Sequence, residues 1–168
     1  LITTDKNEKE DVTKSTSDPI INMPIVLLTN EYSASASEIL AAALKENGKA
    51  TLVGTTTYGK GIIQELHQLS DGSGLKITTN EYFTPNHNAI HEIGIEPDIE
   101  VELSDEAKAQ LELPEEDDTQ LQKAIEYMIN AKTIYLFGVG SSAIVAYDFS
   151  QKLLRIGKKA IYNTDIHV

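Results

Sequence analysis

Hydrophobic and polar positions along residues 24–64 follow the order expected of two strands with a helix between them. Residues 25–28 form an apolar run of strand length, rich in leucine and β-branched residues, and residues 51–53 form a second such run. A turn of small residues at 33–37 follows the first run, and Lys60, flanked by two glycines, follows the second. The pattern predicts a β-α-β unit with serines at one turn and a lysine at another.

The helix of this unit is expected over residues 36–46, because Asn47-Gly48 is a typical helix end. Its predicted apolar face consists of Ile39, Leu40, Ala43 and Leu44. We expect this face to pack on the sheet.

Residues 62–69 and 75–83 are two further strands, joined by Asp71-Gly72-Ser73-Gly74, which is a strong hairpin signal. Residues 98–103 alternate acidic and apolar side chains as an edge strand does, and the polar residues 1–22 predict one short strand or tail plus a loop. The second hairpin strand is expected to bury one face and expose the other. Along it, the polar residues Lys76 and Thr78 alternate with Leu75, Ile77 and Thr79, which form the face expected to be buried.

Composition excludes several classes of site. The 168 residues allow one domain or two small ones, and the absence of cysteine excludes disulfides, a cysteine nucleophile and thiolate zinc sites. A net charge of −12 argues against nucleic acid or an anionic membrane surface as a partner. No apolar run approaches the length of a membrane span.

The composition shifts after residue 103. Residues 104–131 read as an acidic linker followed by an amphipathic helix over 119–130. Residues 132–168 are more basic and predict a strand (133–137), a glycine-rich turn, a helix (143–155) and a strand (159–162), in a second β-α-β unit with right-handed crossover.

Ser35 has two interpretations. With Glu38 it fits a capping box, in which serine and glutamate bond each other's backbone N–H groups. It can also be a nucleophile with Lys60 as its base, since Ser-Lys is a known variant of the nucleophile-plus-base arrangement and a buried lysine can lose its proton near neutral pH. The Ala36 N–H at the helix start would then donate a hydrogen bond to the oxyanion that forms next to Ser35. A Ser-His-Asp triad would have to use His67, His87 or His91, and the spacing of these histidines fits no helical metal-ligand pair.

Two stretches, SASASEILAAAL and GKATLVGTTTYGKGIIQ, resemble the catalytic core of the carboxyl-terminal processing proteases, the tail-specific serine peptidases. The resemblance continues to Gly94-Ile95-Glu96-Pro97-Asp98. It implies that Ser35 is the nucleophile, Lys60 the general base and Gln64 the residue that orients the lysine. The implied fold class is α/β: a fragment of a crotonase-like protease core over residues 23–103, preceded by a polar segment, residues 1–22.

The same resemblance implies C-terminal protein tails as substrates, no cofactor, a possible homo-oligomer, and an exported or cell-envelope parent protein. We expect the chain to be a fragment, since it starts at Leu1 and lacks the family's LRxNPGG turn and PDZ domain. That glycine turn supplies an oxyanion donor in the family, so we expect low activity here that rises when the turn is restored.

The segment IYLFGVGSSAIVAYDFSQKLLRIGKKA resembles the first β-α-β unit of a sugar isomerase (SIS) domain of RpiR-type regulators. It implies that Ser141 and Ser142 bind a sugar phosphate, although a plain helix cap by Ser142 is an equal alternative. The SIS-like unit over residues 132–168 would make the chain a chimera, with its seam between residues 117 and 132. Three functions remain open: a peptidase, a sugar-phosphate-binding module and an inactive fragment.

Overall fold

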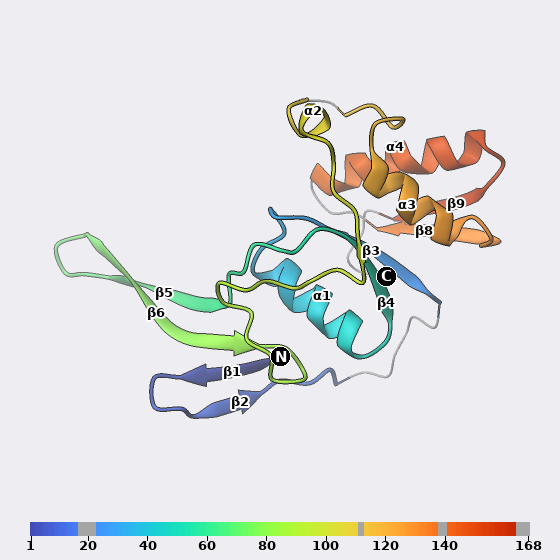
Figure 1. Ribbon diagram of the computed structural model, residues 1–168. Coiled ribbons are helices and arrows are strands. Elements are labelled where there is room, and N and C mark those ends of the chain that lie inside the picture. The colour runs from blue at the N-terminus through green and yellow to red at the C-terminus, as the bar shows by residue number, and fades with distance from the viewer. Residues whose placement is uncertain (17–22, 111–112, 138–140, 164–168) are drawn as a thin grey trace. The chain divides into compact units, whose positions relative to one another are not determined.

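The computed structural model describes residues 1–16, 23–110, 113–137 and 141–163 (Figure 1). The chain divides into two compact units, residues 1–124 and 125–168, and each is described by itself.

The centre of the first unit is a parallel three-stranded sheet in the order β3-β4-β7. Strands β3 (Ile25–Thr29) and β4 (Ala50–Gly54) pair over their whole length, and the edge strand β7 is limited to Ile99–Glu100. Helix α1 (Ala36–Glu46) connects β3 to β4 (Figure 1). The predicted β-α-β unit is confirmed, whereas the edge strand is shorter than expected.

Helix α1 has the predicted bounds but not the predicted buried face. Its buried residues are Glu38, Ala41 and Ala42, and Leu40 is 52% exposed. Ile39 is partly buried against the core cluster. The small alanines let the helix approach β4 closely, so the buried stripe follows i, i+3 and i+4 from Glu38 and leaves Leu40 outside it.

A second, four-stranded sheet in the first unit has the order β2-β1-β6-β5. Strand β1 (Ile2–Asp5) pairs antiparallel with both β2 (Glu10–Val12) and β6 (Gly74–Phe83), and β5 (Ile62–Gln68) pairs with β6. The N-terminal segment therefore forms two strands where one was expected.

The predicted hairpin of β5 and β6 is confirmed, but its predicted buried face is wrong. Leu75 and Ile77 are 48% and 42% exposed, and Thr79 is half-buried. The distal half of this hairpin extends away from the rest of the unit (Figure 1), so neither face is covered there by another described element.

The hydrophobic core of the first unit lies between α1, β4 and the end of β6. Its buried cluster is Ala41, Ala42, Leu52, Tyr82, Ile90 and Ile95. These residues come from α1, from β4, from β6 and from the segment that follows β6. The same core therefore contacts each part of the chain that carries the candidate site.

The acidic stretch holds two helices, α2 (Asp105–Lys108) and α3 (Thr119–Met128). Ser104 caps α2 by accepting the Ala107 N–H at 3.2 Å. Helix α3 spans the division between the units and buries Ala124. Within the described parts of the chain, no helix is long and apolar enough to cross a membrane.

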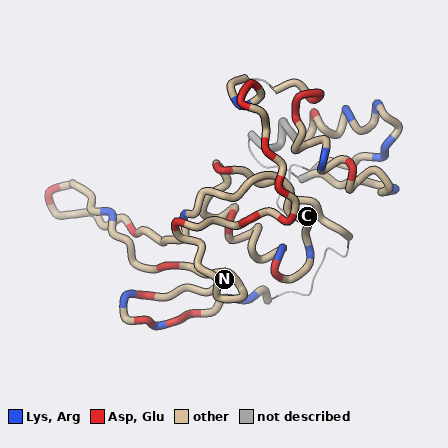
Figure 2. Tube along the Cα trace, viewed as in Figure 1, with Lys and Arg blue, Asp and Glu red and all other residues tan. Residues whose placement is uncertain are grey.

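The second unit is a β-α-β arrangement of β8 (Thr133–Phe137), α4 (Ser141–Arg155) and β9 (Lys159–Asn163). Strands β8 and β9 pair in parallel, as predicted, and α4 begins two residues earlier than expected. Figure 2 shows that Lys and Arg residues of this unit lie in the last turn of α4 and in the turn that leads to β9. The handedness of the crossover stays a prediction.

Candidate active site

The serine turn is built by local hydrogen bonds after β3. The Asn30 side chain accepts the Tyr32 N–H at 3.1 Å, and the Ser33 hydroxyl accepts the Asn30 N–H at 3.1 Å. Side chains of this kind mimic backbone turns and fix a tight reversal without regular structure. The turn delivers Ser35, which is half-buried, to the first turn of α1.

Ser35 has a φ of 58° and a ψ of −114°. A non-glycine residue in this region costs roughly 1–3 kcal/mol, and such residues concentrate at functional sites where surrounding contacts hold them. The strain therefore supports a role for Ser35 beyond that of a helix cap.

The capping interpretation is also supported. The Ser35 N–H donates to Glu38 Oε2 at 2.8 Å, which is the reciprocal bond of a capping box. Ala36, the next residue, is exposed, and its N–H makes no hydrogen bond to any described residue. This N–H is therefore available to an incoming acceptor beside Ser35.

The lysine turn fits tightly against the chain segment after β6. A Cβ on Gly61 would lie 2.4 Å from the His91 backbone nitrogen, and one on Gly59 would lie 3.0 Å from that of Ile93. Because glycine has no Cβ, these two positions allow the close approach of the two segments. Thr57 also bonds this segment, since its hydroxyl accepts the Ile95 N–H at 2.8 Å.

Glu38 joins the two turns, and sequence reasoning recognised only its local capping role. Its side chain is fully buried and accepts four hydrogen bonds. Oε2 accepts the backbone N–H groups of Ser35 at 2.8 Å and Lys60 at 2.9 Å. Oε1 accepts the Thr57 hydroxyl at 2.5 Å and the Gly59 N–H at 2.6 Å. Because one oxygen bonds both amides, the backbone nitrogens of Ser35 and Lys60 lie no farther apart than those two bonds together.

Tyr82 is a second connection that sequence reasoning missed. This residue is 2% exposed, its N–H donates to the Gly61 carbonyl at 2.9 Å, and its hydroxyl donates to the Lys60 carbonyl. Burial raises the pKa of the Tyr82 phenol, a hydrogen bond from the Ser35 side chain opposes this, and the Glu38 charge adds to the rise in pKa. The tyrosine thus bonds the lysine turn through both its hydroxyl and its backbone.

The side chains of Lys60 and Gln64 are less constrained than their backbones. Lys60 is half-buried, and its ammonium makes no hydrogen bond or ion pair with the described residues. Gln64 is exposed and donates to the Thr78 hydroxyl at 3.4 Å. The ladder between β5 and β6 is irregular at residues 63 and 64, so the register changes where this side chain emerges. No hydrogen bond joins Gln64 to Lys60 here, and its orienting role stays a prediction.

The sugar-phosphate candidates belong to the second unit. Residues 138–140 of the glycine-rich turn lie outside the described residues, and Ser141 and Ser142 are described only as the start of α4. Within the described ranges, no cluster of three or more histidine or acidic residues is arranged to hold a metal ion.

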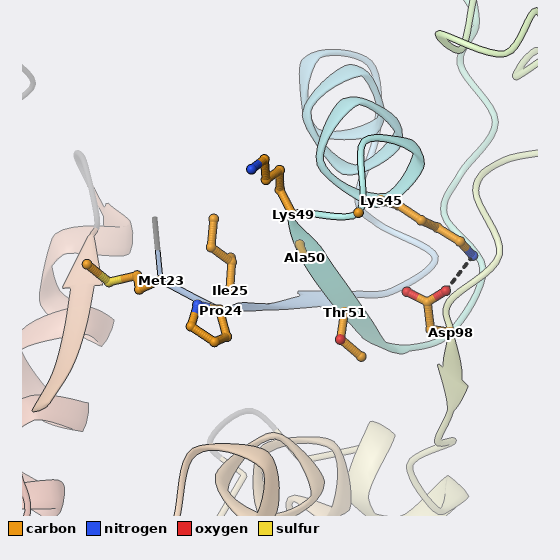
Figure 3. Close-up of a pocket in the computed structure, with 9 residues that line it drawn as sticks. Met23, Pro24, Ile25, Lys45, Lys49, Ala50, Thr51 and Asp98 are labelled. Carbon is orange, nitrogen blue, oxygen red and sulfur yellow. Dashed lines mark ion pairs between the residues drawn. The ribbon is translucent and has the colours of Figure 1, made fainter. Parts of the chain in front are cut away.

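A pocket of about 560 Å³ lies at the amino ends of β3 and β4 (Figure 3). It is lined by the starts of both strands and the end of α1, and the Lys45–Asp98 ion pair of 3.2 Å closes one side. The carboxyl end of β3 instead leads to the serine turn, and the carboxyl end of β4 leads through Thr55–Thr57 to the lysine turn.

Comparison with known proteins places this arrangement in a family. Residues 1–101 match Peptidase family S41. The carboxyl-terminal-processing protease of Synechocystis sp. is 47% identical over 111 residues, which cover 66% of this chain and 26% of that protein. Carboxyl-terminal-processing peptidase 1, chloroplastic, of Arabidopsis thaliana is 53% identical over 81 residues, or 48% of this chain and 17% of that protein.

A lipoprotein from Streptococcus agalactiae has a similar fold, with a TM-score of 0.57 at 21% identity over 76% of this chain and 43% of its own. The chain spans only 26% and 17% of the length of the two curated relatives named above. The α/β class and the resemblance to the processing proteases are confirmed by these matches. The chain belongs to peptidase family S41.

Proposed function

We propose that the first unit carries the catalytic residues of a serine endopeptidase that cleaves near the C-termini of proteins. The observation that carries the proposal is the shared Glu38 oxygen, which fixes the backbones of Ser35 and Lys60 side by side. The names of the relatives support the substrate class, since several are carboxyl-terminal-processing proteases. We also assign the crotonase-like variant of the α/β class to this unit.

In the proposed reaction, the Ser35 Oγ attacks the carbonyl carbon of the scissile peptide bond while the neutral Lys60 amine takes the serine proton. The carbonyl oxygen gains the negative charge and accepts the Ala36 N–H. As the tetrahedral intermediate collapses, the C–N bond breaks and the protonated lysine delivers its proton to the leaving amine.

The resulting acyl-enzyme is an ester of Ser35. Lys60, neutral again, takes a proton from a water molecule that attacks the ester carbonyl, and the serine leaves with that proton. In this scheme Gln64 orients the lysine side chain through a hydrogen bond.

The test is covalent labelling by a fluorophosphonate probe. Wild-type protein is expected to react at a serine, Ser35→Ala to lose the reaction, and Lys60→Ala to slow it by roughly 10²–10⁴-fold. Ser37→Ala and Lys49→Ala are matched controls, because both side chains are exposed, and both variants should retain labelling. Labelling that survives Ser35→Ala would refute the proposal.

The substrate class is tested separately. A peptide that ends in a free, apolar C-terminus should be cut faster than the same sequence fused to a folded domain at that end. Equal cleavage of both would contradict action on C-terminal tails. The parent protein is proposed to act outside the cytoplasm, and the named relatives include bacterial and chloroplastic proteins.

A second candidate function belongs to residues 132–168. The observation that favours it is the parallel pairing of β8 and β9 around a helix that directly follows the sequence Gly138-Val139-Gly140. Helix starts of this kind bind phosphate through backbone N–H groups. We propose sugar-phosphate binding at Ser141 and Ser142, tested by thermal shift with a panel of sugar phosphates. A shift no larger than that given by inorganic phosphate would contradict recognition of the sugar.

A further inference from the structure

The outer edge of strand β5 pairs with no other described strand. β5 stands at one end of the sheet order β2-β1-β6-β5 and is seven residues long. At the other end of the same sheet, β2 is only three residues long and carries two acidic side chains, Glu10 and Asp11. Short strands and charges are devices that keep sheet edges from pairing with other chains. β5 contains neither lysine nor proline, so its long edge has little such protection.

The direction of the backbone groups along this edge follows from the hairpin turn. The Leu69 N–H donates to the Ser73 carbonyl at 2.7 Å, so residue 69 points its N–H toward β6. This direction alternates from residue to residue, and the irregularity in the β5–β6 ladder lies before residue 64. The residues whose N–H and C=O groups point away from β6, to the open edge, are therefore Gln64, Leu66 and Gln68.

The sequence of β5 is self-complementary about Leu66. When two copies lie antiparallel with a two-fold axis at Leu66, this residue faces its own copy and Gln64 faces Gln68. The outward backbone groups of these three residues then fall opposite one another and can bond. Glu65 faces His67 of the second copy, in the type of pair that brings side chains closest together.

We propose that this edge joins two copies of the chain by antiparallel pairing of β5 with β5, in the register that places Leu66 opposite itself. Leu66 is 75% exposed in the single chain, and the pairing covers it with an equal apolar side chain. The distal half of the hairpin extends away from the rest of the first unit (Figure 1), so a second copy can approach the edge. The proposal does not depend on the proposed peptidase activity.

Charge favours this register over its neighbours. The outward groups stay opposite one another only if the strands slide by two residues at a time. A slide in one direction places Glu65 opposite itself, which is destabilising, and a slide in the other places Glu65 opposite Leu69. Of these three registers, only the proposed one pairs each carboxylate with an imidazole. The two side chains already share a face, since His67 Nε2 lies 3.4 Å from Glu65 Oε2 within one chain.

Cysteine cross-linking tests the register directly, because the chain contains no cysteine. In the proposed pair the two Cα atoms of residue 66 are about 5.5 Å apart, a distance that a disulfide spans. Leu66→Cys should therefore form a covalent dimer under mild oxidation. Gln68→Cys is the matched control, since residue 68 is exposed on the same edge and its two copies lie about 13 Å apart along the strands. Equal cross-linking of both variants, or none for Leu66→Cys, would overturn the proposal.

Sedimentation velocity of the full chain measures the association without a cross-link. Between roughly 1 µM and 1 mM, the wild type should pass from monomer to dimer. Leu66→Lys places two cations opposite each other and should weaken the dimer roughly tenfold or more. Leu75→Lys is the control, because Leu75 is 48% exposed in the same hairpin but belongs to β6. A wild type that stays monomeric, or a dimer that both variants weaken equally, would contradict pairing through β5.

An exchange of charges tests the contact between Glu65 and His67. His67→Glu places carboxylates opposite each other at two symmetric positions, so the dimer should weaken by roughly two- to thirtyfold. Adding Glu65→His to that variant again pairs each carboxylate with an imidazole and should recover the association of the wild type. If the second change recovers nothing, the proposed register is wrong.

Discussion

The two units of this chain are stabilised in different ways. In the first unit, a fully buried carboxylate bonds groups 19 to 22 residues away and holds two turns in place. In the second unit, the buried Ser150 hydroxyl donates within its own helix, to the Tyr147 carbonyl at 2.6 Å, and the Lys158 side chain bonds the distant Ile129 carbonyl from an exposed position. Long-range polar contacts fix positions within fractions of an ångström, whereas apolar packing of one helix on two strands fixes mainly the topology.

Exposure of apolar side chains shows the same difference. A two-stranded sheet with one helix has a face that no element of its own unit can cover. Tyr135 and Ile161, which pair across the two strands, are 43% and 40% exposed, whereas Tyr162 on the opposite face contacts Tyr147 of α4 edge-on, with ring centroids 5.1 Å apart. The candidate catalytic residues belong to the unit whose contacts can hold a defined geometry.

The largest expected effect comes from Glu38→Ala. It leaves the buried N–H of Gly59 and the Thr57 hydroxyl without their acceptor, so we expect the first unit to lose about 3–5 kcal/mol of unfolding free energy. Labelling of Ser35 should be lost as well. Urea unfolding followed by backbone NMR measures each unit separately.

The control is Glu46→Ala, on the same helix, whose carboxylate bonds exposed groups of Asn86 and Asn88 at 2.7 and 3.0 Å. A loss from Glu46→Ala as large as that from Glu38→Ala would contradict the special role of the buried carboxylate.

Leu153→Ala should break the second unit and leave the first intact. Leu153 is 2% exposed, and truncating a buried leucine costs about 2–5 kcal/mol. Leu154→Ala is the control, since its side chain is 49% exposed and the change should cost less than about 0.5 kcal/mol. Amide hydrogen exchange should show lost protection in β8, α4 and β9 only. Reduced labelling of Ser35 by Leu153→Ala would show that the units depend on each other.

Gly61→Ala tests the close approach of the lysine turn. The added Cβ would lie 2.4 Å from the His91 nitrogen, so backbone must move, at a cost of about 1–3 kcal/mol. In Gly74→Ala the nearest atom is the flexible Leu66 side chain at 3.2 Å, and little change is expected. Thermal unfolding compares the two. Equal melting temperatures would indicate that the lysine turn adjusts freely.

The smallest effect concerns the tip of the β5–β6 hairpin. Hydrogen bonds from the Ser73 side chain and N–H hold the pKa of the Asp71 carboxyl below its ordinary value of 3.8. A lowered folded-state pKa means that the stabilisation is present above the unfolded pKa and is lost as pH falls through the folded pKa. NMR titration of Asp71 should show a midpoint below 3.8 that rises in Ser73→Ala. An unchanged midpoint in that variant would contradict the assignment.

Local pattern was sufficient for the elements of the first unit. The bounds of α1 follow from a serine and glutamate at its start and Asn47-Gly48 at its end, and all these signals lie within the helix or next to it. The hairpin turn at residues 71–74 is equally local. Such signals need no knowledge of what the segment packs against.

Packing and long-range contacts were not predictable in the same way. Leu40 belongs to an apolar pattern but is exposed, since the neighbouring strand fits the alanine side of the helix. Glu38 reads as a capping residue because its bond to Ser35 is local, whereas its bonds to the lysine turn require the fold. Tyr82 reads as an ordinary strand residue for the same reason.

The left-handed backbone at Ser35 sets an evolutionary constraint on this chain. Glycine suits a φ of 58° better than any other residue, so Ser35→Gly should make the protein more stable while removing the proposed nucleophile. Selection for heat resistance alone would then favour glycine at this position, and under the proposed mechanism the serine exchanges stability for chemistry. An inactive form for trapping substrates is accordingly better made with alanine, which keeps the strained turn as it is.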